Sequence, residues 1–326
     1  MSPDLELLTV GRISVDLYAE QLDVPLREVR TFRKSVGGTA TNVAVAAARL
    51  GRRAAVLTKI GDDPFGDYIR WALAETFGVD TRFVGVDPDL RTPLAFAELD
   101  PPDDPTIVFY REPKAPDLNL TAADVDLDTV TSVPVLWVSA GALSAEPSRT
   151  TTQQLLAARR RREHTVVDLD WRPQMWDAPA SATRELEQAL AQATLAIGNR
   201  AECEIAVGTT DPDTAAERLL GRGLTGAIVK LGGDGVLVAT ADGRRELVAP
   251  FPVEVVCGLG AGDAFGGALC HALLSGWDLA RAARHGNAAG AIVAGRLMCA
   301  DDMPYAHEID ALLTDREPTG LRAADG

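Results

Sequence analysis

Residues 257–265 read Cys-Gly-Leu-Gly-Ala-Gly-Asp-Ala-Phe, and this stretch is the most informative about the fold and its chemistry. Its small residues form a turn just before an expected helix at 261–276, so the N–H groups of Gly260, Ala261 and Gly262 can converge on one point. Such a site suits the charge that develops on a transferring phosphoryl group. Asp263 lies beside it and can accept a proton from an attacking hydroxyl. The alternative is a plain glycine-rich turn with Asp263 as the helix cap, and spacing alone does not decide between the two.

The sequence around this stretch alternates between apolar strands and amphipathic helices, which predicts an α/β fold with a parallel sheet covered on both faces. Residues 82–112 differ, because their short alternating stretches are broken by prolines, and they indicate a small antiparallel flap. We expect strands near 5–10, 54–57, 135–138, 165–169, 194–197 and 227–231, a hairpin near 235–249, and further helices near 39–50, 64–77, 148–162, 183–193, 212–221 and 279–296.

The composition of the chain limits the kinds of binding partner and cellular compartment that we expect. The 326 residues carry a net charge of −15, which disfavours nucleic acid and anionic membrane surfaces. The N-terminus lacks the pattern of a signal peptide, and no long apolar run predicts a membrane span. Cys203, Cys257, Cys270 and Cys299 lack metal-site spacing, so we expect small buried side chains in a reducing, cytoplasmic setting. The run Arg159–Arg162 ends a predicted helix, where we expect it to favour the negative end of the dipole in water.

Two common phosphate-binding motifs are excluded. Residues 221–226 match the letters GxGxxG, but they leave a helix and enter a strand, the reverse of the dinucleotide fingerprint. The Walker A pattern is absent from the sequence. The sequence therefore lacks the fingerprint of a nicotinamide dehydrogenase in the place that this class of enzyme requires.

Three motifs together resemble the ribokinase/PfkB family of carbohydrate kinases, and the resemblance runs from Gly11 to about Leu312. The first is Gly37-Gly38-x-x-x-Asn42-x-Ala44 followed by Arg49-Leu50-Gly51; the second is Lys59-Ile60-Gly61-Asp62-Asp63-x-x-Gly66; the third is Gly260-Ala261-Gly262-Asp263-Ala264-Phe265. The resemblance implies a kinase that uses ATP and Mg²⁺, with Asp263 as the catalytic base.

The resemblance also implies the residues that hold the sugar. Asp16, five residues after Gly11, matches a ligand of the sugar hydroxyls, and Gly38 and Asn42 match residues that line the same pocket. Without the resemblance, Asp16 would be interpreted as part of a strand-end turn and Asn42 as a polar residue early in a helix.

For the nucleotide, Asn199 and Glu202 match an Asn-x-x-Glu element that organises magnesium and phosphate largely through water, although Asn199 can also simply cap the next helix. Lys230, Gly232 and Gly235 match the strand and turn that line the ATP site, and Asn287 matches a residue near the adenine. Many members carry Asp-Thr before Gly-Ala-Gly-Asp. Here Gly258-Leu259, or Cys257-Gly258 in another register, stand in its place, so monovalent-cation binding stays open.

Two arginines suggest a sugar acid as substrate. Arg111 follows Phe109-Tyr110 in the expected flap, and Arg172 lies in Asp168-Leu-Asp-Trp-Arg-Pro173 after a core strand. Two guanidinium groups aimed at one pocket would suit a carboxylate, while either alone can be a surface ion pair. These motifs resemble kinases of 2-keto-3-deoxygluconate, and the Asp-Leu-Asp-Trp-Arg-Pro form resembles those of 5-dehydro-2-deoxygluconate in inositol breakdown.

The family's architecture is expected throughout: one ribokinase-like domain over residues 1–314, a three-layer α/β/α sandwich with a mostly parallel central sheet and a small β-sheet lid. We place the lid in segments 12–35 and 82–112 and a flexible tail in 315–326. Open flap edges predict a homodimer. Two alternatives stay open, a kinase for 2-keto-3-deoxygluconate or another sugar, and a non-catalytic regulator that binds sugar or nucleotide.

Overall fold

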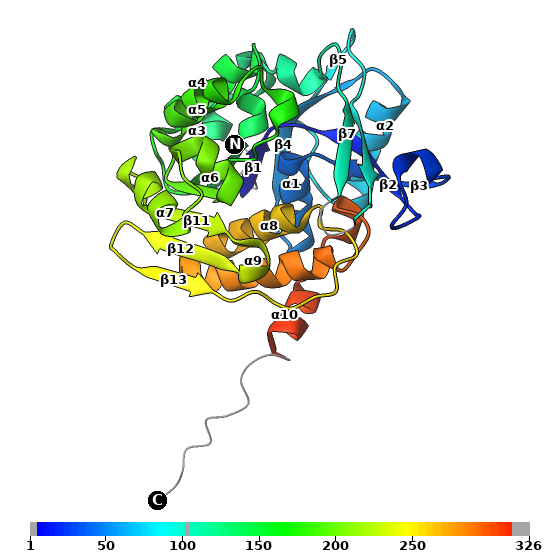
Figure 1. The fold of residues 1–326 in the computed structure, drawn as a ribbon. Helices are drawn as coiled ribbons and strands as arrows, with labels where there is room; N and C mark the ends of the chain where they lie inside the picture. Colours follow the sequence, from blue (N-terminus) through cyan, green and yellow to red (C-terminus); the bar gives the residue numbers. More distant parts are fainter. Residues whose placement is uncertain (1–4, 102–104, 315–326) are drawn as a thin grey trace, which may run out of the picture.

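Two β-sheets organise the chain, as Figure 1 shows in a computed structural model that describes residues 5–101 and 105–314. The predicted tail at 315–326 lies outside these residues. Among them, nine strands form a large sheet in the order β13-β12-β11-β10-β9-β8-β1-β4-β5, parallel except for the β11–β12–β13 hairpin connections. Its strands are β1 (Leu7–Val10), β4 (Ala54–Gly61), β5 (Val84–Asp87), β8 (Val135–Ser139), β9 (Thr165–Asp168), β10 (Leu195–Asn199), β11 (Gly226–Lys230), β12 (Val236–Thr240) and β13 (Arg245–Val248).

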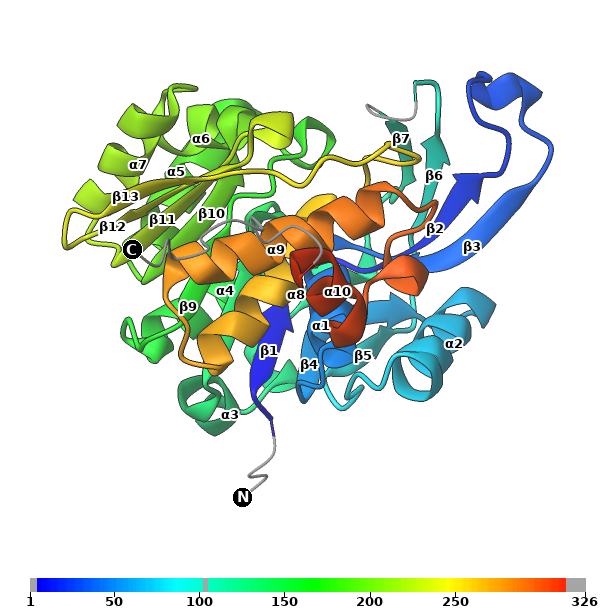
Figure 2. The ribbon, with the colours of Figure 1, turned by 90° about the horizontal axis from the view of Figure 1, so that it is seen from below.

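Helices cover both faces of the large sheet, so the fold is the expected ribokinase-like α/β/α sandwich (Figures 1 and 2). Each face carries one buried apolar cluster that joins strands to helices, because the strands alternate their apolar side chains between the two faces. One layer contains α1 (Thr39–Arg49), α2 (Pro64–Trp71), α8 (Ala261–Leu274), α9 (Leu279–Ala294) and α10 (Ala306–Thr314); the other contains α3 (Leu127–Ser132), α4 (Ser148–Arg159), α5 (Pro179–Leu190), α6 (Arg200–Val207) and α7 (Pro212–Gly221).

The smaller sheet has the strand order β3-β2-β6-β7 and projects from one side of the sandwich (Figure 2). Its strands are β2 (Ser14–Ala19), β3 (Phe32–Gly37), β6 (Leu94–Glu98) and β7 (Thr106–Tyr110). Residues that pair directly across strands share a face of the sheet. Asp16 therefore shares the inner face with Ala95 and Phe109, while Leu17 and Phe96 lie on the outer face.

The predicted flap segment 82–112 begins too early. Val84–Asp87 pairs with Thr58–Gly61 of β4 in parallel and forms the edge of the large sheet. Val84–Asp87 is short and half-exposed, a pattern that an antiparallel edge strand would also show. The second lid segment in the structure is the β6–β7 hairpin.

The chain order changes direction between β1 and β8. From β1 the sheet grows one way through β4 and β5, and from β8 it grows the other way through β9, β10 and β11. In open α/β sheets, a crevice forms at such a switch point outside the carboxyl ends of the strands. The loops that carry Arg12, Asp170 and Arg172 leave the sheet at this edge, as does the end of β11 with Lys230.

Within the arginine run at 159–162, Arg160 and Arg162 are exposed as predicted, but Arg159 is not. Arg159 ends α4 but is only 2% exposed, and its guanidinium donates to the carbonyl oxygens of Val130 (3.0 Å) and Pro134 (2.8 Å). It therefore caps carbonyl groups near the end of α3, where a planar group with five donors can satisfy several acceptors at once. All four cysteines are buried and free, as predicted. No helix in the described part of the chain is both long and apolar enough to cross a membrane.

Candidate active site

The glycine-rich turn opens α8 as predicted. Gly260 is the N-cap residue with φ +80, and a β-carbon there would lie 2.5 Å from Sγ of Cys299, so the turn needs glycine. No side chain caps this helix, which excludes the interpretation of Asp263 as a helix cap. Instead, Nδ2 of Asn42 in α1 donates to Oδ2 of Asp263 at 2.7 Å. The carboxylate is thus held by a side chain of another helix.

Asp263 lines a cavity of about 580 Å³ at the carboxyl ends of the strands, which we call the Asp263 cavity. The cavity brings together residues from six separate parts of the chain. Its polar and glycine lining includes Thr39, Asp168, Asp170, Arg172, Asn199, Glu202, Lys230, Gly260, Gly262 and Asp263.

Lys230 and Glu202 lie at the glycine-rich end of this cavity. A β-carbon on Gly262 would be 3.2 Å from Nζ of Lys230, and the same Nζ lies 3.9 Å from Oε2 of Glu202. Glu202 also accepts from the backbone N–H of Asn199 (2.6 Å), while Oδ1 of Asn199 accepts from the N–H of Glu202 (2.9 Å). Asn199 therefore caps α6, as the simpler interpretation proposed. Glu202 remains 5% exposed at the cavity wall.

Asp170 is held between two guanidinium groups. Nε of Arg12 lies 3.5 Å from Oδ2 and Nε of Arg172 lies 3.2 Å from Oδ1, and Ser139 donates its hydroxyl to Oδ2 at 2.8 Å. Burial opposes ionisation of Asp170, but Arg12 and then Arg172 outweigh it and hold the pKa of this carboxyl far below its usual range.

The neighbouring carboxyls shift the other way. Burial raises the pKa of Asp263 to about 6, against the opposing hydrogen bond from Asn42. Burial also raises the pKa of Asp168, which Lys230 only partly offsets. Titratable groups whose environments push their pKa values apart are a mark of catalytic sites. Asp263 is thus a carboxylate near pH 7 that can still take up a proton.

The inner face of the small sheet brings Asp16 towards the same region. Asp16 accepts hydrogen bonds from the hydroxyls of Ser14 (2.6 Å) and Tyr18 (3.2 Å), and burial raises the pKa of its carboxyl. Gly38 is the N-cap residue of α1 with φ +101, and a β-carbon there would lie 2.3 Å from the carbonyl oxygen of Arg12. Asn42 is 2% exposed and its Oδ1 has no partner among the described residues. It is an acceptor that a hydroxyl could satisfy.

Arg111 and Arg172 do not share one cavity. Arg172 lines the Asp263 cavity, whereas Arg111 lines an adjoining one with Trp176 and Lys114, here called the Arg111 cavity. Nη2 of Arg111 donates to Oδ1 of Asp117 at 2.6 Å, and the Asp117 side chain is 1% exposed. The two cavities adjoin along Phe109 and Gln174. The prediction of two guanidinium groups aimed at one pocket therefore needs correction, because the two side chains line different cavities and each pairs with a buried acid, Asp117 or Asp170.

A third cavity adjoins Lys230 on its other side and contains the residues predicted for the nucleotide. This Asn287 cavity is lined by Gly232, Gly235 and Asn287, and it shares Lys230, Gly258 and Gly262 with the Asp263 cavity. Nδ2 of Asn287 donates to the carbonyl oxygens of Val248 (3.2 Å) and Ala249 (2.9 Å), which fixes α9 against the end of β13. The two cavities thus form one groove that passes over the start of α8.

Comparison with known proteins decides the family. Residues 4–306 match the pfkB family of carbohydrate kinases. The chain belongs to this family. It is 33% identical over 321 residues to a 5-dehydro-2-deoxygluconokinase from Bacillus anthracis (strain CDC 684 / NRRL 3495), which covers 96% of each chain.

Solved structures agree with this membership. A PfkB protein from Polaromonas sp. JS666 is 28% identical, with a TM-score of 0.80 over 94% of this chain and 99% of that one. An E. coli protein described as a ribokinase II, in complex with ATP and Mg²⁺, shares the fold at 24% identity, with a TM-score of 0.85 over 95% and 99%. The chain is therefore a phosphotransferase that acts on a sugar hydroxyl.

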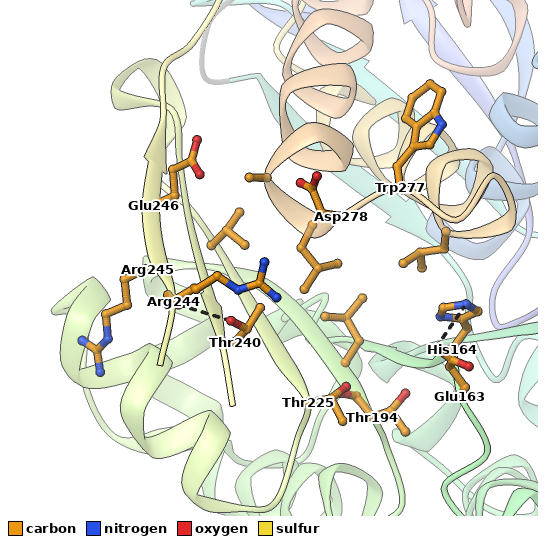
Figure 3. Close-up of a pocket in the computed structure, with 15 residues that line it drawn as sticks. Glu163, His164, Thr194, Thr225, Thr240, Arg244, Arg245, Glu246, Trp277 and Asp278 are labelled. Atoms are coloured by element: carbon orange, nitrogen blue, oxygen red, sulfur yellow. Dashed lines mark hydrogen bonds and ion pairs between the residues drawn. The ribbon is translucent and has the colours of Figure 1, made fainter. Parts of the chain in front are cut away.

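The PfkB chain contains a further cavity that is unrelated to these residues. The Trp277 cavity lies at the opposite, amino-terminal edge of the sheet, lined by Thr194, Thr225, His164 and the start of α9, and Figure 3 shows Arg244 and Trp277 on its opposite walls. Its arginines pair with nearby acids, Arg244 with Asp242 (2.8 Å) and Arg245 with Asp213 (3.1 Å). All four of these side chains are at least 41% exposed.

Four residues of the Asp263 region were not assigned from the sequence: Arg12, Thr39, Asp168 and Asp170. Asp168 ends the core strand β9, Asp170 follows it, and Arg12 follows β1, so their position at carboxyl strand ends was a usable signal. No group of three or more His, Cys, Asp or Glu side chains within residues 5–101 and 105–314 could hold a metal ion by itself.

Proposed function

We propose that this PfkB kinase transfers the γ-phosphoryl group of ATP to a primary hydroxyl of a sugar acid, with 5-dehydro-2-deoxy-D-gluconate as the substrate. The observation that carries the proposal is the position of Asp263. Its carboxylate is held by Asn42 beside the amide groups that open α8, in a cavity continuous with the Asn287 cavity. The identity to 5-dehydro-2-deoxygluconokinases favours this sugar acid over 2-keto-3-deoxygluconate.

In this proposal Asp263 is the general base. Its pKa of about 6 leaves the carboxylate largely ionised near pH 7, so it can take the proton of the sugar hydroxyl as the oxygen bonds to the γ-phosphorus and the bond to ADP breaks. The amides of Gly260, Ala261 and Gly262 and the ammonium of Lys230 face the charge that develops on the phosphoryl oxygens. Asn42 keeps the base aimed and leaves its own Oδ1 for a sugar hydroxyl.

The residues present fit ATP and Mg²⁺. Gly232, Gly235 and Asn287 would hold the nucleotide, whose phosphates would extend past Lys230 towards Gly262. Glu202, buried beside Lys230, would hold Mg²⁺ through water, since this ion keeps several waters and few protein ligands. When bound, Mg²⁺ would offset negative charge on the phosphates. The ATP and Mg²⁺ in the E. coli ribokinase II support this assignment.

The sugar would lie between the lid and α1, with Asp16 and Gly38 beside its hydroxyls and Arg172 towards the phosphoryl group. Phe109 and Ile107 of β7 already line the Asp263 cavity from the lid side. Such a cover would exclude water, so that ATP is not hydrolysed in place of the sugar reaction. The free buried cysteines fit the proposed cytoplasmic location.

The outer face of the lid supports the proposed homodimer. Phe32, Phe96 and Tyr110 form an edge-to-face row across three strands, with ring centroids 5.4 Å apart at each step. Tyr110 is 62% exposed. We propose that a second copy covers this row. Tyr110→Asp should give monomers in analytical ultracentrifugation, whereas the equally exposed Leu247→Asp on β13 should leave the dimer intact. A monomeric wild-type protein would refute it.

The proposed activity is tested by ADP release with Mg·ATP over a panel of 5-dehydro-2-deoxygluconate, 2-keto-3-deoxygluconate, ribose and fructose. We expect the highest kcat/KM for the first compound and product phosphorylated at its primary hydroxyl. Preference for 2-keto-3-deoxygluconate would transfer the assignment to that substrate. Sugar binding without turnover at saturating Mg·ATP would instead indicate a regulator.

A further inference from the structure

Arg12 lies at the junction of the two sheets, between the end of β1 and the start of β2. It is 7% exposed. Its Nη2 donates to Oγ1 of Thr39 at 2.7 Å, its Nε lies 3.5 Å from Asp170, and its guanidinium lies 5.7 Å from the centroid of the Phe109 ring. All three neighbours line the Asp263 cavity. The Arg12 side chain therefore lies between the lid and the floor of the site.

The other cations near the cavity have partners, although Nη1 of Arg111 and Nε of Arg172 are buried without a hydrogen bond among the described residues. Arg111 makes a short ion pair with buried Asp117, and Lys114 donates to the carbonyl oxygen of Glu146 at 2.6 Å. Lys230 pairs with Glu202 above Gly262, at the phosphate end of the groove.

Arg172 shares the carboxylate of Asp170 with Arg12. Its Nε lies close to Asp170, and the next carboxylates that raise its pKa are Glu202 and Asp263. Each of these two arginines thus lies closer to a buried acid than Arg12 does, Arg111 to Asp117 and Arg172 to Asp170.

Arg12 retains unused capacity. Its one ion contact, to Asp170, is single and long, and Asp170 is shared with Arg172. Within residues 5–101 and 105–314, Nη1 of Arg12 has no hydrogen-bond partner. Its charge also acts on Asp16, the proposed sugar ligand on the inner face of the lid. A buried guanidinium with a free donor and a weak counter-ion is suited to a carboxylate, because both can then be satisfied in one geometry.

We infer that Arg12 is the specificity residue that binds the carboxylate of the sugar acid, the role that the sequence suggested for Arg111 and Arg172. This rests on the proposed function, and it deepens that proposal by naming the group that recognises the acid. The substrate lies with its carboxylate against Nη1 of Arg12 and its primary hydroxyl towards Asp263. Thr39 and Asp170 hold the guanidinium plane in place.

The test compares 5-dehydro-2-deoxygluconate with its primary amide, in which an uncharged group of the same shape replaces the carboxylate. Binding is measured by titration calorimetry with Mg·ADP present, and turnover by ADP release. In wild type we expect the acid to be preferred. Arg12→Gln should reduce the ratio of acid to amide affinity by about 100-fold, the effect of a lost hydrogen bond between charged groups. Arg12→Lys keeps the positive charge but not the planar guanidinium group, and it should reduce this ratio by less.

Arg172→Lys and Arg111→Lys are the matched variants, and each should change the affinities for acid and amide in equal proportion. Because Arg12 is buried, Mg·ADP affinity serves as the check that each variant is folded; if Arg12→Gln fails this check, the ratio in Arg12→Lys decides. An unchanged acid-to-amide ratio in the folded variant would overturn the inference, as would a wild type that binds the amide as well as the acid.

Binding and turnover separate the two proposals. If wild type binds the acid without phosphorylating it and the Arg12 variants lose the preference, the inference stands and the proposed kinase substrate falls. If wild type phosphorylates neutral sugars and does not bind the acid, the family activity stands and the inference is overturned.

Discussion

The Asp263 cavity and the Trp277 cavity occupy opposite edges of the same sheet and have nearly the same volume, about 580 Å³ each. Their chemistry differs. At the carboxyl edge, buried carboxylates have pKa values shifted in opposite directions, and Asn42 keeps an unpaired oxygen. At the amino edge, Arg244 and Asp242 form an ion pair that is exposed to solvent, and such pairs are weak. The proposed active site therefore differs from the surface hollow in its buried charges and its unpaired polar atom, and not in its volume.

The largest difference that we expect between the Asp263 cavity and the Trp277 cavity is the effect of a substitution on kcat. Asp263→Asn removes the proton acceptor while keeping the shape, so kcat should fall by about 10²- to 10⁴-fold, with ATP affinity within a few-fold of wild type. Steady-state kinetics and nucleotide titration measure both values. Turnover comparable to wild type would remove Asp263 from the mechanism.

The second prediction concerns the pH dependence that only the Asp263 edge should show. Because the base must be ionised, kcat/KM should fall as pH drops below about 6. Asn42 donates to the carboxylate and lowers its pKa, so Asn42→Ala should move the acidic limb to higher pH by about one unit. If the acidic limb of the kcat/KM profile does not move in a variant with wild-type circular dichroism, the proposed effect of Asn42 on Asp263 is contradicted.

The third prediction concerns stability. The pKa of Asp263 is raised in the folded state, so the stability linked to it is full below its ordinary pKa and is lost as pH rises through about 6. At about pH 8, Asp263→Asn should therefore raise the melting temperature by a few degrees.

Asp170 shows the opposite shift. Its pKa is lowered in the folded state, so its contribution to folding stability is lost only as pH falls through the folded-state pKa. Asp170→Asn should lower the melting temperature at the same pH, since it leaves two guanidinium groups without their acid. Calorimetric scans in which both variants move in the same direction would show that the opposite shifts are not real.

The smallest effect is expected at the amino edge. Arg244→Ala breaks an exposed pair, so kcat, KM and the melting temperature should remain within error of wild type. The same kinetic and melting measurements apply. A loss of activity there would mean that the Trp277 cavity also serves the reaction.

The sequence predicted the layers of the fold and the glycine-rich turn that opens α8, because periodicity and glycine-rich turns are local signals. The turn at 257–263 folds as expected, and Asn42 meets Asp263 across 221 residues of sequence in the region that the motifs indicated. Capping of α6 by Asn199 was also visible beforehand as the simpler alternative.

Pairing between charges was not predictable in the same way. Nothing local to Arg111 indicates that buried Asp117 pairs with it, or that Arg159 caps distant carbonyl groups. Arg12 was overlooked because its role depends on three neighbours from separate elements. Similarly, Val84–Asp87 looks like a flap strand until β4 is placed beside it. Such contacts depend on tertiary packing, which a single sequence does not display.

The most direct test of the central claim follows the phosphoryl group itself in a single turnover with γ-labelled ATP, Mg²⁺ and 5-dehydro-2-deoxygluconate. We predict that the wild-type protein transfers the label to the sugar acid, with little free phosphate, and that the label stays on ATP with Asp263→Asn. Label that reaches the sugar equally fast in both proteins, or that wild type releases only as inorganic phosphate, would contradict it.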